Sequence, residues 1–356
     1  MKKNRVEYLD FLKGNCIFLV VFCHYCMLPG DTVFGNIVMC AAWGAVPCFF
    51  LASGGLMHGS AEWNWKKYAK KVIRIYSVLC IWKAIYFVIY YLNGGISCSK
   101  AALAEYLFFF GRIENINADV MWFMEAYLLI MLFWPVSRFL FQGAKAGRQV
   151  LSFVIGILFV NEYLIPAINF ALLHSIAKIS GSVPQISFQS VVPFNNYGNM
   201  LFFFLAGAFL FEYREKITVY LEKRKWIPWI FTAAGIFLLM FVKYIENGIW
   251  TWGGIYIENG YGRIAVVLLA AGLYASALLT RENRVTHWVA AWIGTNTQGI
   301  YYMHYIALAM FSAHYAYLYE SVMSFTANVI KTIVTLLICV IVSVMIKKIP
   351  LLRYLV

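Results

Sequence analysis

Long apolar stretches separated by short polar segments run along the whole chain. Ten of these stretches reach or approach the roughly 20 residues that an α-helix needs to cross the hydrocarbon core of a bilayer. The pattern therefore predicts an all-α, polytopic integral membrane bundle of about ten transmembrane helices. The predicted spans are residues 11–29, 33–57, 71–92, 119–141, 149–172, 199–212, 226–243, 261–280, 287–311 and 324–346.

Composition supports the same class of protein. Hydrophobic residues make up 62% of the 356 residues and charged residues only 13%, a balance that excludes an ordinary water-soluble fold. The chain stops soon after the last predicted span, so we expect residues 1–356 to form a single transmembrane domain with no appended soluble domain. No small-residue cleavage site follows the first apolar run, so we expect that run to remain as a helix rather than to be removed as a signal peptide.

The net charge of +13 would also suit a nucleic-acid partner, but its distribution indicates a membrane. If the N-terminus is cytosolic, most of the 29 Lys and Arg residues fall in the alternate segments that are then cytosolic. These basic segments lie at 2–13, 66–74, 138–148, 214–225, 281–284 and 347–353. The positive-inside rule thus predicts a multi-pass protein of the cell membrane with both termini in the cytoplasm and no nucleic-acid partner.

The first apolar run carries His24, an ionisable side chain where such groups are costly and are usually functional. Lys13 precedes it by eleven positions, which on a helix brings the two side chains within about 20° of one face and about 16 Å apart along the axis. A cation near one surface and a proton acceptor deep in the bilayer therefore lie along the same face of the helix, in one stripe. Asp10 lies one turn before Lys13 and is expected to pair with Lys13 or Arg5, either to hold a ligand gate or only to neutralise charge.

The cluster Cys23-His24-Tyr25-Cys26 resembles a metal site at first sight. Adjacent helical residues point about 100° apart, so only the two cysteines lie within reach of each other, and no second Cys/His pair has ligand spacing. We expect no metal. Nearly all eight cysteines fall within predicted spans, where they pack as small apolar residues, and no disulfide framework is expected.

Further motifs follow the Lys13/His24 pair in a fixed order along the chain. They are Arg5 to Asp10 with Gly14, Val46 to Gly54, the basic run Lys66 to Arg74, Trp122-Phe123 with Pro135, Phe202 to Gly207, and Ile293 to His304. In this order they resemble the membrane acyltransferase-3 family, whose members transfer acetyl or other acyl groups to cell-surface carbohydrates. The resemblance spans essentially the whole chain and implies an acyl donor, a carbohydrate acceptor and a catalytic histidine on the first helix.

His24 is the candidate catalytic residue. Acyl transfer to a sugar hydroxyl requires a base that takes the hydroxyl proton, and an imidazole, with an ordinary pKa of about 6.5, suits that role. The ring would serve equally as a transient carrier of the acyl group. The alternative to both roles is a structural histidine hydrogen-bonded between helices.

Acetyl-CoA, the expected donor, carries three phosphate groups and needs a basic entrance on the cytosolic side. The run from Trp63 to Arg74 supplies one, because Lys67, Lys70, Lys71 and Arg74 recur at helical spacing. The predicted donor-binding residues are Lys13, Arg5, Lys70, Lys71 and Arg74. The alternative is a topology anchor that contacts anionic lipid.

Polar side chains also mark the ninth and fourth spans. Thr297, Tyr301 and His304 follow i, i+4, i+7 spacing and share one helix face. They either line the acceptor or acyl pocket or form hydrogen bonds that hold helices together. Glu125 in the fourth span either orients the first-helix histidine or pairs with a cation such as Lys83.

The sequence therefore predicts a membrane O-acyltransferase that moves an acyl group, acetyl in the simplest case, from cytosolic acyl-CoA to a hydroxyl of a cell-surface or lipid-linked carbohydrate. The outer segments near 173–198 and 244–260 contain aromatic and amide side chains that suit sugar binding, although any membrane-interface loop has a similar composition. These side chains are Asn195, Asn196, Tyr197, Trp250 and Trp252. A transporter or flippase for a polar or lipid-linked solute is the main alternative, because intramembrane His, Glu and Lys also mark transport paths. A non-catalytic scaffold is the third.

Overall fold

The computed structural model describes residues 5–25, 33–59, 63–94, 96, 98–113, 116, 121–175, 197–247, 260–314, 325–350 and 352–356. Within these ranges the ordered elements are helices, and no β-strand is present. The elements are α1 (Glu7–Tyr25), α2 (Val33–Ala42), α3 (Ala45–His58), α4 (Trp65–Leu92), α5 (Lys100–Phe108), α6 (Trp122–Gln142), α7 (Lys145–Phe159), η2 (Val160–Leu164), α8 (Ile165–Ser175), α10 (Gly198–Glu212), α11 (Arg214–Glu222), α12 (Ile227–Asn247), η3 (Gly260–Gly262), α13 (Ile264–Leu278), α14 (Arg284–Trp288), η4 (Val289–Gly294), α15 (Thr297–His314) and α17 (Phe325–Lys348).

The all-helical membrane architecture predicted from the sequence is confirmed. In the described part of the chain, six helical stretches are long and apolar enough to cross a membrane: Ile37–His58, Trp65–Leu92, Trp122–Gln142, Lys145–His174, Ile227–Glu246 and Asn328–Lys348. Shorter apolar helices, among them α10 and α13, accompany them. Each of the ten predicted spans falls mainly on helix, whereas the number of membrane crossings stays a prediction.

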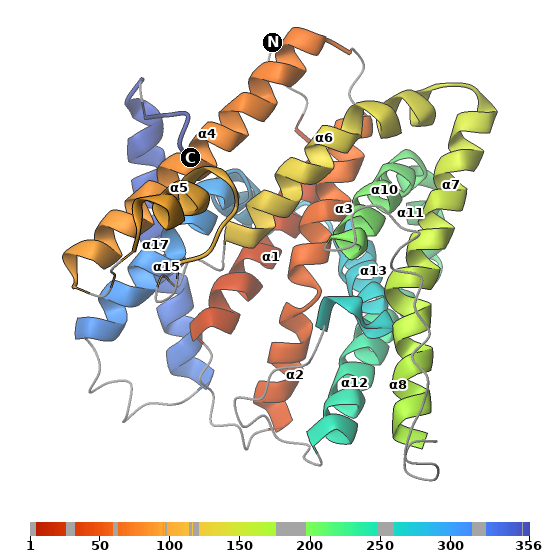
Figure 1. Cartoon of the computed structure of the whole chain (residues 1–356). Helices are drawn as coiled ribbons and strands as arrows, with labels where there is room; N and C mark the ends of the chain where they lie inside the picture. Colours follow the sequence, from red (N-terminus) through yellow and green to blue (C-terminus); the bar gives the residue numbers. More distant parts are fainter. Residues whose placement is uncertain are drawn as a thin grey trace.

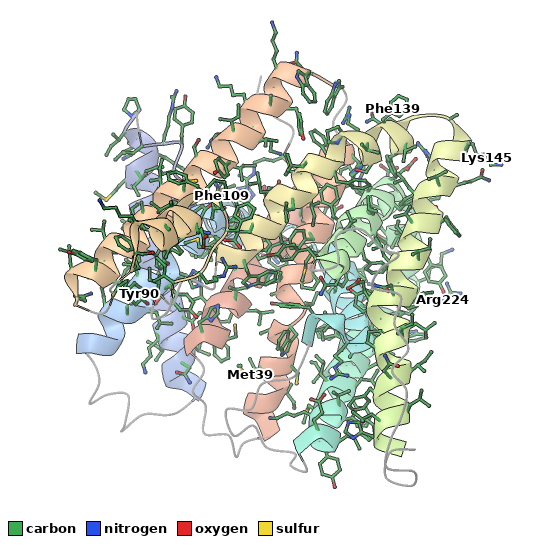
Figure 2. The ribbon with its side chains drawn as sticks, viewed as in Figure 1. Met39, Tyr90, Phe109, Phe139, Lys145 and Arg224 are labelled. Carbon is green, nitrogen blue, oxygen red and sulfur yellow. The ribbon has the colours of Figure 1, made fainter. Side chains whose placement is uncertain are left out.

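The helices form a tilted bundle with α1 and α3 near its middle. The continuous α7–α8 stretch forms one edge, and α17 with α4 and α5 forms the opposite edge (Figure 1). Large apolar side chains such as Phe109 and Phe139 project outward from the bundle (Figure 2). Such an outer surface suits a hydrocarbon solvent, in which apolar residues have no reason to be buried.

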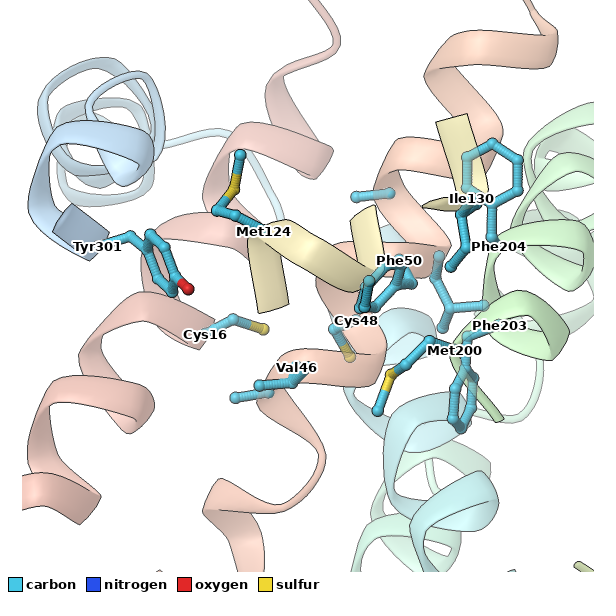
Figure 3. Packing of buried hydrophobic residues seen from close by; sticks show 14 of the residues in the cluster. Cys16, Val46, Cys48, Phe50, Met124, Ile130, Met200, Phe203, Phe204 and Tyr301 are labelled. Carbon is cyan, nitrogen blue, oxygen red and sulfur yellow. The ribbon is translucent and has the colours of Figure 1, made fainter. Parts of the chain in front are cut away.

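Two sequence motifs build a close contact between helices. A Cβ atom on Gly54 of α3 would collide with the backbone carbonyl of Phe204, and one on Gly207 of α10 would collide with that of Leu51. Small residues let the two backbones approach closely, which is a major source of helix association in membranes. The surrounding core includes Cys48, Phe50, Met200, Phe203 and Phe204 (Figure 3). The motifs Val46 to Gly54 and Phe202 to Gly207 therefore stabilise the α3–α10 pair.

Two predicted spans are interrupted, which the sequence analysis did not foresee. A turn at Trp43–Gly44 separates α2 from α3, and another at Thr295–Asn296 separates η4 from α15. Backbone groups freed inside a membrane need new partners. Lys347 of α17 supplies one, because its Nζ donates to the carbonyl of Thr295 at 3.3 Å and to Oδ1 of Asn296 at 2.6 Å. The break is thus stabilised from a neighbouring helix.

The predicted cytosolic segments are joined in pairs by polar contacts. These contacts are Glu7 with His287 (2.7 Å), Arg148 with Glu212 (2.6 Å), and Arg74 with the carbonyl oxygen of Tyr354 (3.4 Å). Each contact joins a residue of one basic segment to a residue that lies beside another, and the positive-inside rule places these segments on the same side of a membrane. The orientation of the bundle relative to the cytoplasm itself stays a prediction.

Candidate active site

A cavity of about 750 Å³ lies between α1, α3, α4, α6 and α15. Its cationic side chains, which we call the basic entrance, are Lys13, Lys67, Lys71 and Arg74. The opposite part, which we call the histidine end, is formed by His24, His304 and Tyr305. Apolar and aromatic side chains line the wall between these two groups.

One stripe of α1 faces the cavity along its length. The stripe consists of Lys13, Ile17, Val20 and His24. These positions follow i, i+4, i+7, i+11 spacing and span about 16 Å of helix. The stripe predicted from the sequence therefore leads from the basic entrance to the histidine end.

Asp10 orients Lys13 from outside the cavity lining. Its Oδ1 lies 2.7 Å from Nζ of Lys13, and its Oδ2 accepts a hydrogen bond of 2.9 Å from Nε of Arg5. Arg5 also donates to the carbonyl of Ala290 at 2.8 Å, which ties the start of α1 to η4. Asp10 therefore contacts both of its predicted partners, Lys13 and Arg5. Arg5 does not line the cavity and reaches it only through Asp10 and Lys13.

The first turns of α4 supply the rest of the basic entrance. Asn64 caps the helix by accepting a hydrogen bond of 2.9 Å from the backbone N–H of Lys67. Lys67, Lys71 and Arg74 then recur at helical spacing and line the cavity. Lys70, which the sequence analysis placed with them, is exposed and does not line the cavity. Lys67 belonged to the same predicted basic run but was not among the selected residues.

His24 and His304 lie side by side, with ring centroids 5.4 Å apart. Tyr305 is the next residue after His304, and its hydroxyl is 3.2 Å from Nδ1 of His24. A hydroxyl can donate or accept, so this contact is compatible with either tautomer of His24. No other hydrogen bond of His24 is present in the described part of the chain. Its Nε2 therefore has no hydrogen bond to a described residue.

Backbone carbonyls fix the tautomer of His304. Its Nδ1 lies 2.6 Å from the carbonyl oxygen of Tyr301 and 3.2 Å from that of Ile300. A carbonyl only accepts, so Nδ1 carries the proton and Nε2 carries the lone pair. Nε2 has no hydrogen-bond partner among the described residues, although His304 is only 1% exposed. A buried acceptor without a partner costs about 1–3 kcal/mol, so packing alone does not account for this ring.

The polar face predicted for the ninth span also turns to the cavity. Thr297, Tyr301 and His304 all line it, together with Gln298. The ring of Tyr301 packs against that of Phe123 of α6, with centroids 5.3 Å apart. The structure thus brings most of the predicted residues of α1, α4 and α15 to one cavity, namely Lys13, His24, Lys71, Arg74, Thr297, Tyr301 and His304.

Glu125 belongs to a separate group of charges, the ion cluster of Lys83, Glu125 and Arg112. Oε1 of Glu125 lies 2.7 Å from Nζ of Lys83, and Arg112 donates to both carboxylate oxygens at 2.8 and 2.7 Å. Nζ of Lys83 also lies over the rings of Tyr106 and Phe110, at 5.2 and 5.6 Å. Of the two roles considered for Glu125, the structure contains the pairing with Lys83 and, among the described residues, no contact with His24. Arg112 was missed because a single loop arginine carries no periodic signal.

Several residues of interest in the sequence lie outside the described residues. These are Cys26 and the outer-segment residues Asn195, Asn196, Trp250 and Trp252. The sequence analysis assigned no role in the site to the aromatic lining of the cavity, although it named Trp63 and Trp122-Phe123 within motifs. Trp63, Tyr68 and Trp134 lie beside the basic entrance, and Trp122, Phe123 and Tyr127 lie on the α6 side. The helical spacing of Trp134 and Tyr127 on one apolar face was the available signal, but core packing gives the same signal.

The fold and the cavity together define a multi-pass membrane protein with an internal site that joins cations to an imidazole pair. A family model described as an acyltransferase domain, that of the acyltransferase-3 family, matches residues 6–344. The chain therefore belongs to the acyltransferase-3 family, and the resemblance seen in the sequence is confirmed. No curated protein and no solved structure matches the chain.

Proposed function

We propose that this protein is a membrane O-acyltransferase that transfers an acyl group, acetyl in the simplest case, from cytosolic acyl-CoA to a hydroxyl of a cell-surface or lipid-linked carbohydrate. Residues 1–356 act as one transmembrane domain in this proposal, with both termini in the cytoplasm. Membership of the acyltransferase-3 family supports acyl transfer. The observation that carries the proposal is the single cavity that joins the basic entrance to His24.

The donor binds with its phosphates at the basic entrance. Lys13, Lys67, Lys71 and Arg74 offer charge-assisted hydrogen bonds, which are the strong ones for phosphate oxygens. The thioester arm then follows the α1 stripe, where Ile17 and Val20 face the cavity, to the histidine end. Arg5 contributes by holding Asp10, and Lys70 contributes only to the positive potential outside the cavity.

His24 carries the chemistry in one of two ways. As a general base, its free ring nitrogen takes the proton from the acceptor hydroxyl while the hydroxyl oxygen attacks the thioester carbon. The C–S bond then breaks, the thiolate of CoA takes the proton back from the imidazolium, and the products are the ester and free CoA thiol. As an acyl carrier, the same nitrogen attacks the thioester carbon first and expels the CoA thiolate. The acceptor hydroxyl oxygen then attacks the acyl carbon and displaces the imidazole, and the hydroxyl proton passes to the thiolate, so the products are again the ester and free CoA thiol. Thr297, Tyr301 and His304 provide polar groups for the acceptor in either route.

The test uses labelled acetyl-CoA and membrane vesicles from cells that express the protein, whose own glycans serve as acceptors. His24→Gln is expected to reduce both thiol release and label in the glycans by about 10²- to 10⁴-fold. The matched control is His174→Gln, because His174 lies near the end of α8 and does not line the cavity. Activity that persists in His24→Gln would contradict the mechanism. Movement of a labelled solute across the vesicles without thiol release would favour the transporter instead.

A further inference from the structure

Three aromatic rings meet beside the basic entrance and form what we call the aromatic cluster, Trp63, Tyr68 and Trp134. The ring centroid of Trp63 lies 5.3 Å from that of Tyr68 and 5.4 Å from that of Trp134, and the other two are 5.7 Å apart. All three residues line the cavity. They come from the segment before α4, from α4 and from α6, so tertiary packing brings them together.

The aromatic cluster contains one exposed ring, that of Trp63, and one N–H donor without a partner among the described residues, that of Trp134. Trp63 is 43% exposed and so retains accessible ring surface beside the cavity. Trp134 is only 8% exposed, and its Nε1–H has no hydrogen-bond partner among the described residues. The indole N–H can only donate, and leaving it buried without a partner is unfavourable. It therefore points to a ligand that supplies an acceptor atom.

Cations surround the same rings. Nζ of Lys71 lies over the ring of Trp134 at 5.9 Å from its centroid, and Lys67 and Arg74 line the cavity from the same face of α4. A flat ring surface, a single N–H donor and several cations together match a phosphorylated purine nucleoside. Such a ligand offers a π-face for stacking, ring nitrogens that accept hydrogen bonds, and phosphate oxygens for the cations.

We propose that the aromatic cluster is the nucleotide subsite of the donor. The adenine ring of acyl-CoA stacks on Trp63 and accepts a hydrogen bond from Nε1–H of Trp134, while Lys67 and Lys71 bind the phosphates. This inference rests on the proposed use of acyl-CoA. It adds that the protein requires the nucleotide half of the donor, so acetyl-pantetheine is a poor substitute for acetyl-CoA.

The experiment compares acetyl-CoA with acetyl-pantetheine in the purified full chain, reconstituted in zwitterionic lipid with a carbohydrate extract as acceptor. Trp63→Ala is expected to raise the KM for acetyl-CoA by roughly 5- to 100-fold, the range of one base–aromatic stack, and to leave the KM for acetyl-pantetheine unchanged. Trp65→Ala is the matched control, because Trp65 is an adjacent, more exposed tryptophan that does not line the cavity. Its ring packs against Tyr68 at 5.3 Å and against Trp63 at 6.3 Å, so this variant reports what the loss of aromatic packing alone does. Gel filtration confirms that both variants are folded.

Adenosine 3′,5′-bisphosphate provides a second readout that does not need turnover. It is expected to compete with acetyl-CoA in the wild type and in Trp65→Ala, and to lose at least fivefold in affinity in Trp63→Ala. Equal use of acetyl-CoA and acetyl-pantetheine by the wild type would overturn the subsite while the acyl transfer itself remained. Absence of transfer from either donor would instead overturn the proposed function. Equal effects of Trp63→Ala and Trp65→Ala that depend on added anionic lipid would show a lipid-headgroup contact and also overturn the subsite.

Discussion

Two of the polar groups buried in the described part of the molecule, the ion cluster and the histidine end, have opposite surroundings. In the ion cluster, the carboxylate of Glu125 contacts both Lys83 and Arg112, and Lys83 and Glu125 are each 1% exposed. At the histidine end, two rings lie in contact and Nε2 of His304 has no partner among the described residues. The first group lies off the cavity lining and the second lies on it.

The difference distinguishes a buried group that stabilises the fold from one that can bind a ligand. A buried charge is tolerated when opposite charges lie beside it, and the carboxylate of Glu125 has two cations within 2.7 Å. Ion pairing therefore accounts for the presence of this cluster, although Nζ of Lys83 makes no hydrogen bond to a described residue. An acceptor on a cavity wall that lacks a hydrogen-bond partner lowers the stability of the folded protein until a ligand supplies that partner. We therefore propose that Glu125 belongs to the scaffold and His304 to the site, although both are ionisable residues in predicted membrane spans.

The largest expected effect is on stability and concerns the ion cluster. Glu125→Gln leaves two cations without their carboxylate, and breaking such a pair costs about 3–5 kcal/mol. The melting temperature of the purified protein in detergent should therefore fall sharply. Glu215→Gln, at an exposed pair with Arg214, is the control and should change little. Unchanged stability with lost activity would place Glu125 in the site and erase the contrast.

The next effect tests the unpaired histidine. His304→Leu removes an acceptor that has no partner among the described residues, together with an N–H that is donated only to carbonyls of its own helix. The melting temperature should therefore fall less than in a variant that loses a bond between helices, while acyl transfer falls at least tenfold. His58 is the comparison, because it is equally buried but both of its ring nitrogens are hydrogen-bonded, to the Gly54 carbonyl at 2.9 Å and to Ser137 at 3.0 Å. His58→Leu should lower the melting temperature by more. A reversal of this pattern would show that His304 is structural.

The smallest effect concerns the contact between Tyr305 and His24. Tyr305→Phe keeps the ring beside both histidines and deletes one hydrogen bond worth about 0.5–1.5 kcal/mol. We expect kcat to fall by roughly 2- to 12-fold, which is that energy expressed as a rate. Tyr220→Phe, at an exposed position on α11, serves as the control. A change as large as that of His24→Gln would mean that the hydroxyl itself takes part in the chemistry.

Local periodicity explains what the sequence could predict. The shared stripe of Lys13 and His24 and the common face of Thr297, Tyr301 and His304 follow from 3.6 residues per turn. The structure places all five on one cavity. Nothing beyond the helix itself was needed to foresee which side chains point the same way.

Contacts between helices explain what could not be predicted from the sequence. Lys70 and Lys71 are adjacent in a basic run, and only the rotation of α4 against α6 decides that Lys71 faces the cavity and Lys70 does not. The meeting of Arg112 with Glu125 likewise depends on how the segment before α6 packs. The helix break at Asn296 is stabilised by Lys347, which comes from a helix that is distant in the sequence. Periodicity within one helix carries no information about these rotations and partners.

The narrow cavity between α1 and α4 also sets a limit on molecular size. With about 750 Å³ between the helices, no folded carrier protein can follow its acyl group inside, so any donor must present that group on a slender tether. A bulky fatty chain and the acceptor would then compete for the same restricted volume. We therefore expect short-chain donors to be used better than long-chain ones, before any contact with the acyl group itself is considered.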